Sequence, residues 1–322
     1  MNDKTLSGNK FPMVEQTRKH ARSNGISTVI LGLSGGSDSV TLLSVLLDAG
    51  ICVKAIHCNF NLRGEESLRD RKFVEELCRK KNVALKIFDL DVDAYRKTRK
   101  KTSVEMACRD LRFDIFRKEM ILSDAQRICV AHNADDNIET FFINMLRGSG
   151  TRGLKGMDGD NGEIWRPLLG FHKKEICRYL NERNLEYVTD STNLESEYRR
   201  NIIRNEIIPL FKNEWKGFDK AMDSTIKNIS SENKVVEEEI EKIIAEHPEG
   251  IPVKTILGFP APELLVKRFI DPAGPYPATP VEIISALKAE KPHAPLWKLK
   301  RGTVTVRKHL LKCETELSET NT

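Results

Sequence analysis

The chain has 322 residues, of which 39% are hydrophobic and 31% charged, and its 52 Lys and Arg against 47 Asp and Glu give a formal net charge of +5. These values predict a soluble globular protein with room for two domains, and the mild positive charge is compatible with a polyanionic partner without requiring one. Seven cysteines without a CxxC pair exclude a disulfide framework and indicate a reducing cytoplasm, and the lack of any 18-residue apolar run excludes a membrane span.

The first half of the chain alternates predicted strands and helices. Its first ten residues contain no apolar run, so no secretory signal is expected. Short β-branched and apolar runs predict strands at Thr28–Leu33, Val53–His57, Leu85–Leu90 and Arg127–Ala131. Helical patterns follow at Ser39–Ala49, Glu65–Lys81, Ser103–Leu122 and Asp135–Arg147, the third opened by a capping box in Thr102–Glu105. Such repeated units predict an α/β fold with a doubly wound parallel sheet, which binds ligands at the carboxyl ends of its strands.

The second half of the chain differs in composition. A glycine-rich segment at 147–163 precedes helical patterns at 172–184 and 201–213, and a charged helix at 223–247 is suited to bridge two bodies. From Gly250 on, the chain carries many prolines, one helical pattern at Pro280–Ala289 and an alternating basic strand in WKLKRGTVTVRKHLLK. We therefore predict an N-terminal α/β domain over 1–215, a helical linker over 216–249 and a small C-terminal domain over 250–322.

The segment SGGSDS, residues 34–39, joins the first predicted strand to the first predicted helix. Glycines let backbone N–H groups approach a ligand, and a helix start adds unpaired donors and partial positive charge, so the loop predicts a phosphate site. Asp38 in such a loop suggests a cation, most plausibly Mg²⁺ on a polyphosphate. A glycine turn capped by Ser37 or Asp38 is the alternative. The loop has no lysine, which excludes a Walker A motif.

His132 and three acids form a second polar cluster at the end of the fourth predicted strand. Asp136 and Glu139 are three residues apart and share a helix face, and Asp135 is four residues from Glu139. Acids at a helix start gain about 0.3–1 kcal/mol each from the helix dipole, which is the structural alternative. A histidine and three acids beside a phosphate loop instead predict a functional site.

The SGGxDS loop resembles the pyrophosphate loop of the N-type ATP pyrophosphatases, which adenylate a substrate and release pyrophosphate. Further segments resemble the ordered signature of the tRNA(Ile)-lysidine synthetase family: HCNFNLRGEES (57–67), SVEMACRDLRF (103–113), AHNADDNIETFFINMLRGSGTRGLKGM (131–157), RPLL (166–169) and DSTNLESEYRRNIIRNEIIP (190–209). The resemblance covers roughly residues 27–210 and is only general beyond 215. Whether a further C-terminal tRNA-binding module belongs to the protein is left open.

The resemblance implies ATP-dependent ligation of free L-lysine to the wobble cytidine of tRNA(Ile) with a CAU anticodon. A cytosine carbonyl oxygen attacks the α-phosphate of ATP and releases pyrophosphate, and the lysine ε-amine then displaces AMP. Because a lysine ammonium has a pKa of about 10.4, carboxylates are needed to hold it and accept its proton. We expect Asp136 to be the base and Glu139 to orient the amine, with a Mg²⁺ role for Asp136 as the competing assignment.

The resemblance also implies roles for residues outside these clusters. Arg109 and Arg200 are expected to neutralise phosphate charge during catalysis, although surface arginine is the alternative. We expect an ATP site of Ser34, Gly35, Gly36, Ser37, Asp38, Ser39, His57, Asn59 and His132, with Asp38 and Asp136 as Mg²⁺ ligands; His57 could equally be a packed strand-end residue. The basic run RKTRKK and the RN..R pattern predict tRNA contacts at Arg96, Lys97, Arg99, Lys100, Lys101 and Arg204.

Three other functions remain as alternatives. A tRNA thiolase of the same loop family commonly uses catalytic cysteines, which the lack of a CxxC pair disfavours. Amidotransferase-linked synthesis on a small metabolite is disfavoured by the basic runs and by the lack of an ammonia-generating domain. A non-catalytic RNA-binding protein is disfavoured by the complete loop and acid cluster. The oligomeric state is left open, with a homodimer as one candidate.

Overall fold

The computed structural model describes residues 11–62, 64–99, 102–189, 197–273, 279–289 and 297–315. The chain divides into two units, Met1–Ser230 and Ser231–Thr322, and the division falls within one long helix, α11 (Phe218–Glu246). Each unit has its own sheet and its own buried core. The three-part division drawn from the sequence at 215 and 250 stays a proposal.

The first unit is built on a five-stranded parallel sheet in the order β3-β2-β1-β4-β5. The strands are β1 (Thr28–Gly32), β2 (Cys52–Asn59), β3 (Ala84–Asp89), β4 (Arg127–Cys129) and β5 (Ile164–Trp165). Leu31 of β1 pairs with Ala55 of β2 on one side and with Cys129 of β4 on the other. The predicted doubly wound α/β fold is therefore confirmed, and the order places a topological switch point between β1 and β4, where ligands bind in such sheets.

Alternating residues of the central strands face two separate cores. Val29 and Leu31 face the first core, which is closed by α1 (Pro12–Ser23), α2 (Ser37–Asp48), α3 (Glu65–Lys81) and α8 (Lys173–Glu182). Ile30 faces the second core, where Phe113 and Phe116 of α5 (Val104–Leu122) pack. A strand buried on both faces explains why the β1 sequence is apolar throughout rather than alternating.

A third group of helices packs beside the carboxyl end of the sheet. It comprises α6 (Ala134–Leu146), α7 (Thr151–Leu154), α9 (Glu197–Ile202), a π-helical turn η1 (Ile203–Ile207), α10 (Ile208–Glu214) and the first part of α11. Ile138 and Phe142 of α6 pack against Ile203, Ile208 and Ile226. Because this apolar contact holds the π-turn against α6, polar residues of both elements meet on the side facing the phosphate loop.

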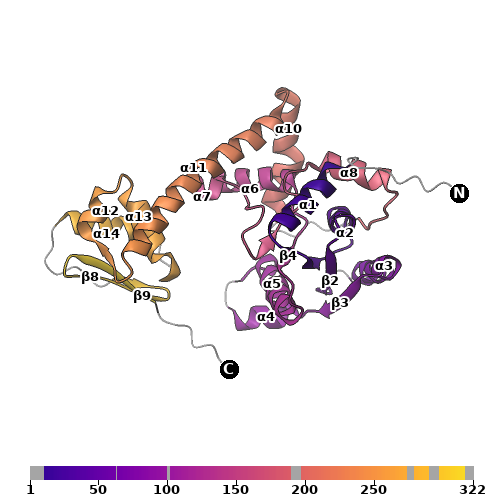
Figure 1. The fold of residues 1–322 in the computed structure, drawn as a ribbon, viewed down its shortest axis with the longest axis horizontal. Coiled ribbons are helices and arrows are strands. Elements are labelled where there is room, and N and C mark those ends of the chain that lie inside the picture. Colours follow the sequence, from indigo (N-terminus) through magenta and orange to yellow (C-terminus); the bar gives the residue numbers. More distant parts are fainter. Residues whose placement is uncertain are drawn as a thin grey trace. The chain divides into compact units, whose positions relative to one another are not determined.

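The second unit combines a small antiparallel sheet with short helices (Figure 1). Its sheet has the order β6-β9-β8-β7, from β6 (Ile251–Pro252), β7 (Trp297–Leu299), β8 (Gly302–Arg307) and β9 (Leu310–Thr315). The helices are α12 (Val253–Gly258), α13 (Pro262–Ile270), the 3₁₀ turn η2 (Asp271–Ala273) and α14 (Thr279–Lys288). The basic tail predicted as one strand forms three, because it turns twice: between Leu299 and Gly302, and at Lys308 and His309, which take positive φ angles of 50° and 59°.

Other local expectations need correction as well. Helices α1 and α4 (Val92–Thr98) were not predicted, and α4 already contains Arg96 and Lys97 of the basic run. The N-cap of α5 is Ser103, whose side chain accepts a hydrogen bond from Met106 N–H, so the cap lies one residue later than the predicted box. Within the described residues, no helix combines the length and the apolar character that crossing a membrane requires.

Candidate active site

The loop at residues 34–39 turns sharply from β1 into α2. Gly35 has a φ of +90°, and a Cβ there would lie 2.9 Å from Val188 Cγ2, so this position requires glycine. Gly36 is the N-cap of α2, with φ −71° and ψ 162°. The serines brace the loop: Ser39 Oγ accepts a hydrogen bond from Gly35 N–H at 3.2 Å and lies 3.1 Å from Ser34 Oγ. The geometry suits a backbone anion site at a helix start.

A cavity of about 440 Å³ opens over this loop. Its lining joins the loop to residues from β2, α5, β4 and the segment before residue 190: Gly32, Leu33, Ser34, Gly36, Ser37, Asp38, Ser39, Ile56, Cys58, Arg109, Arg112, Phe113, Phe116, Val130, Ala131, His132, Tyr187, Val188 and Thr189. Apolar side chains and cationic groups therefore share one pocket, which matches the needs of a nucleobase attached to phosphates.

Two residues expected at the nucleotide are not among those that line this cavity. His57 is buried, with Nδ1 2.9 Å from Leu33 O, and Asn59 is buried and donates to Asp89 Oδ1 at 2.7 Å. Their neighbours Ile56 and Cys58 line the pocket instead, because successive strand residues face opposite ways. Burial raises the pKa of Cys58 to about 11, so this thiol is neutral near pH 7.

His132 lies among arginine side chains at the end of β4. Arg166 Nε lies 3.2 Å from His132 Nδ1. Burial, with the nearby charges of Arg166, Arg109, Arg200 and Arg112 acting in the same direction, lowers the pKa of His132 to about 3. A neutral imidazole surrounded by guanidinium groups marks a strongly positive region suited to a polyphosphate. Arg112 and Arg166 were missed from the sequence, since neither stands out from ordinary surface arginine.

The two acids expected to act on an amine lie together at the start of α6, and arginines hold both. Arg204 Nε donates to Glu139 Oε1 at 2.5 Å, and Arg204 Nη2 donates to Asp136 Oδ1 at 3.1 Å. Arg200 Nε lies 3.3 Å from Glu139 Oε2. Glu139 is only 1% exposed, and burial raises its pKa although Arg204 opposes the shift. Arg204, which the π-turn η1 carries, contacts both acids, and its expected contact with tRNA stays a prediction.

Asp38 is paired with a lysine that no sequence pattern indicated. Lys173, the first residue of α8, places Nζ 2.6 Å from Asp38 Oδ1 and 2.7 Å from Ser37 Oγ. Burial raises the pKa of Asp38, Lys173 opposes the shift, and the charge of Asp136 adds to it. Asp38 and Asp136 therefore interact electrostatically across the site, and Lys173 supplies the cation that the loop sequence lacks. The two residues are 135 positions apart, which hides the pair from local motif reading.

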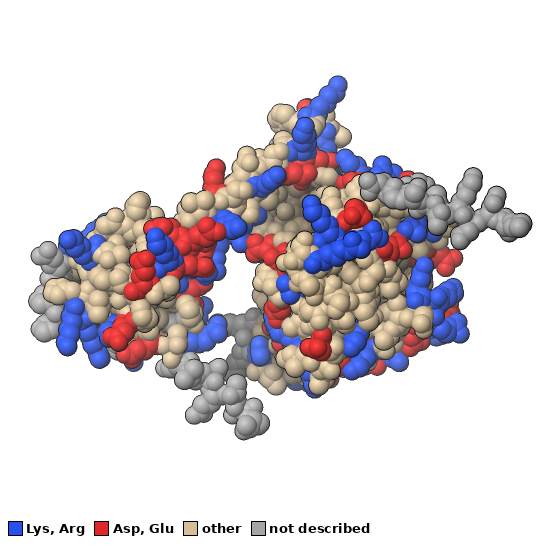
Figure 2. Space-filling view, viewed as in Figure 1, with Lys and Arg blue, Asp and Glu red and all other residues tan. Residues whose placement is uncertain are grey.

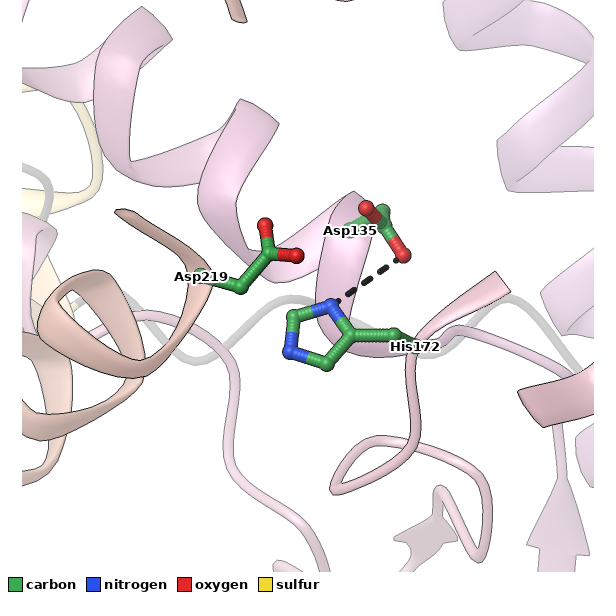
Figure 3. Close-up of side chains that lie close together, drawn as sticks. All are labelled: Asp135, His172 and Asp219. Carbon is green, nitrogen blue, oxygen red and sulfur yellow. Dashed lines mark ion pairs between the residues drawn. The ribbon is translucent and has the colours of Figure 1, made fainter. Parts of the chain in front are cut away.

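Asp135 belongs to a different cluster from its neighbour Asp136. It lies beside His172 and Asp219, and the ligand-type atoms of these three lie within 4.8 Å of one another (Figure 3). However, Lys212 Nζ lies 3.0 Å from a carboxylate oxygen of both Asp135 and Asp219, so an ammonium already supplies positive charge there. We therefore describe this group as an ion-pair network, and the predicted Mg²⁺ ligands Asp38 and Asp136 are not part of it.

The basic run is only partly described. Arg96, Lys97 and Arg99 are exposed, Arg96 Nε donates to Thr102 O at 3.1 Å, and Arg99 packs over the Tyr95 ring. Lys100 and Lys101 lie outside the described residues. Lys and Arg are interspersed with Asp and Glu over the visible face of the molecule (Figure 2). Charge composition alone therefore does not single out an RNA surface.

The comparisons with known proteins agree with this geometry. Residues 11–211 match the family described as the PP-loop domain. The chain is similar to the tRNA(Ile)-lysidine synthase of Bacteroides thetaiotaomicron, at 43% identity over 250 residues, 76% of this chain and 58% of that protein. It is 36% identical to the synthase of Parabacteroides distasonis, in a match that covers 81% of this chain and 60% of that protein. It is 34% identical to the synthase of Chlorobaculum tepidum, in a match that covers 72% of this chain and 71% of that protein. The chain thus spans just under 60% of the first relative's length.

Among solved structures, the U34-tRNA thiolase NcsA of Methanococcus maripaludis, determined with its [4Fe-4S] cluster, has a similar fold. The TM-score is 0.55 with 17% sequence identity, over 68% of this chain and 80% of that one. At this identity the similarity concerns the fold alone.

Proposed function

The chain belongs to the PP-loop family and, within it, to the tRNA(Ile)-lysidine synthases, and we propose that it ligates free L-lysine to the wobble cytidine of a CAU-anticodon tRNA(Ile) in the cytoplasm. One observation carries this proposal. The half-buried Asp136 and the buried Glu139 both contact Arg204, and the charges of Asp136 and Arg204 act on Asp38 of the phosphate loop. Arg200 Nε lies 3.3 Å from Glu139, and the charge of Arg200 acts on His132 at the pocket wall. An ATP site and an amine site placed side by side are what a two-step ligation needs.

The first step is adenylation of the RNA base. The cytosine carbonyl oxygen forms a bond to the α-phosphorus of ATP, the bond to the bridging oxygen breaks, and pyrophosphate leaves. Backbone N–H groups of the 34–39 loop, with Lys173, hold the leaving pyrophosphate, and Arg109 and Arg112 at the pocket wall neutralise charge on the reacting phosphate. The neutral His132 accepts a hydrogen bond from Arg166 at Nδ1, which leaves its Nε2–H as a donor for a phosphate oxygen.

The donor set also fits Mg²⁺. Asp38 and Asp136 offer the carboxylate oxygens that this ion prefers. Burial raises the pKa of Asp38 and the charge of Asp136 adds to the rise, so a cation between them would relieve their repulsion. When bound, Mg²⁺ would neutralise charge on the polyphosphate. Lys173 and Arg204 already partly fill that role around the two acids.

The second step is attack by the lysine ε-amine on the activated ring carbon, with AMP as the leaving group. At pH 7 only about one amine in a few thousand is neutral, so a carboxylate must take up a proton. Asp136 and Glu139 are placed for this, and the raised pKa of Glu139 favours proton uptake. Because Arg204 now holds both acids, we expect the incoming ammonium to displace one of its contacts.

Two assays test the proposal: ATP–pyrophosphate exchange measured without lysine, and the mass of the RNA measured after lysine is added. We expect ATP–pyrophosphate exchange that requires unmodified tRNA(Ile) and needs no lysine, followed by a lysine-dependent mass gain on the anticodon cytidine. Sulfur incorporation into the RNA would point to a thiolase instead. Tight tRNA binding with no exchange and no modification would leave only an RNA-binding protein, and would overturn the proposal.

The basic run is expected to contact tRNA phosphates. Neutralising Arg96, Lys97, Arg99, Lys100 and Lys101 together should weaken tRNA binding and reduce its salt dependence. Each lost phosphate contact should reduce the slope of the logarithm of the binding constant against the logarithm of the salt concentration by about 0.7–0.9. ATP affinity should barely change. A matched variant neutralises five other basic residues, Arg22, Lys72, Arg79, Lys80 and Lys81, all exposed. If both variants change the slope equally, net charge rather than this run is responsible, and an unchanged slope places the RNA elsewhere.

A further inference from the structure

The start of α8 links three elements through two consecutive residues, His172 and Lys173. His172 contacts α6 and α11, and Lys173 contacts the phosphate loop. We propose that His172 is a positioning residue for the nucleotide site, which fixes the start of α8 so that Lys173 reaches Asp38 and Ser37. This inference rests on the proposed function, since it assigns the loop to the phosphates of ATP.

His172 is held from both ring nitrogens. It is 8% exposed, its Nε2 lies 2.9 Å from Asp223 Oδ2, and its Nδ1 lies 3.3 Å from Asp135 Oδ2 (Figure 3). Its backbone N–H donates to Glu175 Oε2 at 2.9 Å, which closes the first turn of α8. Nδ1 is buried and faces Asp135 as an ion pair without hydrogen-bond geometry, whereas Nε2 and the backbone N–H are hydrogen-bonded. These contacts leave the ring little freedom to move, so it defines where α8 begins.

The same carboxylate that holds His172 also holds Lys173. Asp135 Oδ2 accepts a hydrogen bond from Lys173 N–H at 2.7 Å, while Lys173 Nζ reaches Asp38 at 2.6 Å. Asp135 is followed directly by Asp136, which contacts Arg204 and acts electrostatically on Asp38. The network of Asp135 and His172 is therefore connected to the phosphate loop through Lys173 and to the acid pair through Asp136.

The charges around the imidazole favour its protonated form. Asp135 of α6, Asp219 and Asp223 of α11 and Glu175 of α8 surround it, against the cations Lys212 of α10 and Lys173. The contact with Asp135 raises the pKa of His172 to about 9, with Asp223 adding to the rise and burial opposing it. Burial would raise the pKa of Asp135, but contacts from His172, Lys173 N–H and Lys212 outweigh it and hold this pKa below its usual range.

Protonation of His172 also links the network to pH. Because its folded-state pKa lies above the ordinary value of 6.5, protonation stabilises the folded chain fully below pH 6.5, and this contribution is lost as the pH rises through about 9. We expect ATP affinity to fall over the same alkaline range, since the neutral ring no longer pairs with both carboxylates.

The test uses ATP binding by the whole chain, without tRNA or lysine. His172→Gln should weaken ATP binding about tenfold, the size expected for loss of a charge-assisted contact, and should remove the alkaline loss of affinity near pH 9. His172→Arg keeps a permanent cation, so it should restore much of the affinity and hold it above pH 9. His20→Gln is the matched control, because His20 forms a similar 2.9 Å pair with Asp160, away from the loop.

A double-mutant cycle separates positioning from general stability. If His172 acts through Lys173, then His172→Gln should add little to the affinity loss of Lys173→Met. Additive losses, or a His172→Gln chain that melts earlier but binds ATP as the wild type does, would overturn the inference. Wild-type protein that binds no ATP at all would instead refute the proposed function.

Discussion

Gly36→Val is expected to abolish adenylation while leaving the fold largely intact. Gly36 has φ −71° and ψ 162°, which valine adopts readily, and a Cβ at this position meets Ser34 Oγ only at 3.6 Å and Val188 O at 4.0 Å. The side chain would instead occupy the space through which the backbone approaches the pyrophosphate. We expect a loss in ATP–pyrophosphate exchange of about a hundredfold or more, comparable to removing a key backbone donor from a transition state.

The neighbouring glycine provides the contrast for this prediction. Gly35→Val places a side chain at φ +90° and within 2.9 Å of Val188 Cγ2, so it should destabilise the fold by about 1–3 kcal/mol. Thermal unfolding should therefore separate the two variants, with Gly36→Val close to the wild type and Gly35→Val clearly lower. If Gly36→Val is folded and turns over at the wild-type rate, the backbone of this loop does not bind phosphate.

The sequence predicted the sheet well because its signals are local. Four strands of the first unit were predicted from short apolar runs followed by helical patterns, and Thr28–Leu33 agrees with β1 to within one residue. The loop and the acid cluster were found for the same reason, since each lies within ten consecutive residues. The two-residue strand β5 was not predicted, because it is too short to give such a pattern. In the second unit the basic tail was read as one strand, because the turn at Lys308 and His309 contains neither glycine nor proline.

The rest of the site depends on contacts between distant segments. Lys173 reaches Asp38 only because α8 packs on the same side of the sheet as α2, which no local pattern records. Asp135 and Asp136 diverge because consecutive helical residues are about 100° apart, so Asp135 faces the His172 network and Asp136 faces Arg204. Strand alternation could have pointed to Ile56 and Cys58 as pocket residues, because they face the opposite side of β2 from His57 and Asn59.

The two half-reactions are expected to separate through three acids. Asp38→Asn should fail before any adenylated RNA appears, because Asp38 holds Lys173 beside the phosphate loop and is a candidate Mg²⁺ ligand. Glu139→Gln should still consume ATP on tRNA but stall at the adenylated cytidine, since Glu139 is assigned to the amine. Single-turnover reactions with ATP labelled on the α-phosphate should therefore trap label on the RNA with Glu139→Gln and not with Asp38→Asn.

Glu119→Gln is the matched control for these substitutions. Glu119 is also buried and ion-paired, to Lys86 at 2.7 Å, but it lies in α5 away from the lining of the pocket. Its amide variant should react like the wild type at both steps, even if it unfolds at a lower temperature. If Glu119→Gln loses as much activity as the site variants, then lower stability rather than lost chemistry explains the activity losses of all of them.

Asp136→Asn then decides between the two roles of Asp136. Arg204 bridges Asp136 and Glu139, which favours a shared task at the amine, whereas the charge of Asp136 on Asp38 favours a shared cation. If Asp136 is the base, its variant should accumulate labelled RNA as Glu139→Gln does, and its rate should recover partly at higher pH, where more lysine is neutral. If Asp136 is a metal ligand, its variant should form no labelled RNA. A higher Mg²⁺ concentration should then restore part of the labelled RNA. Should Glu139→Gln yield no labelled RNA and keep its lysine affinity, the assignment of this helix to the amine is wrong.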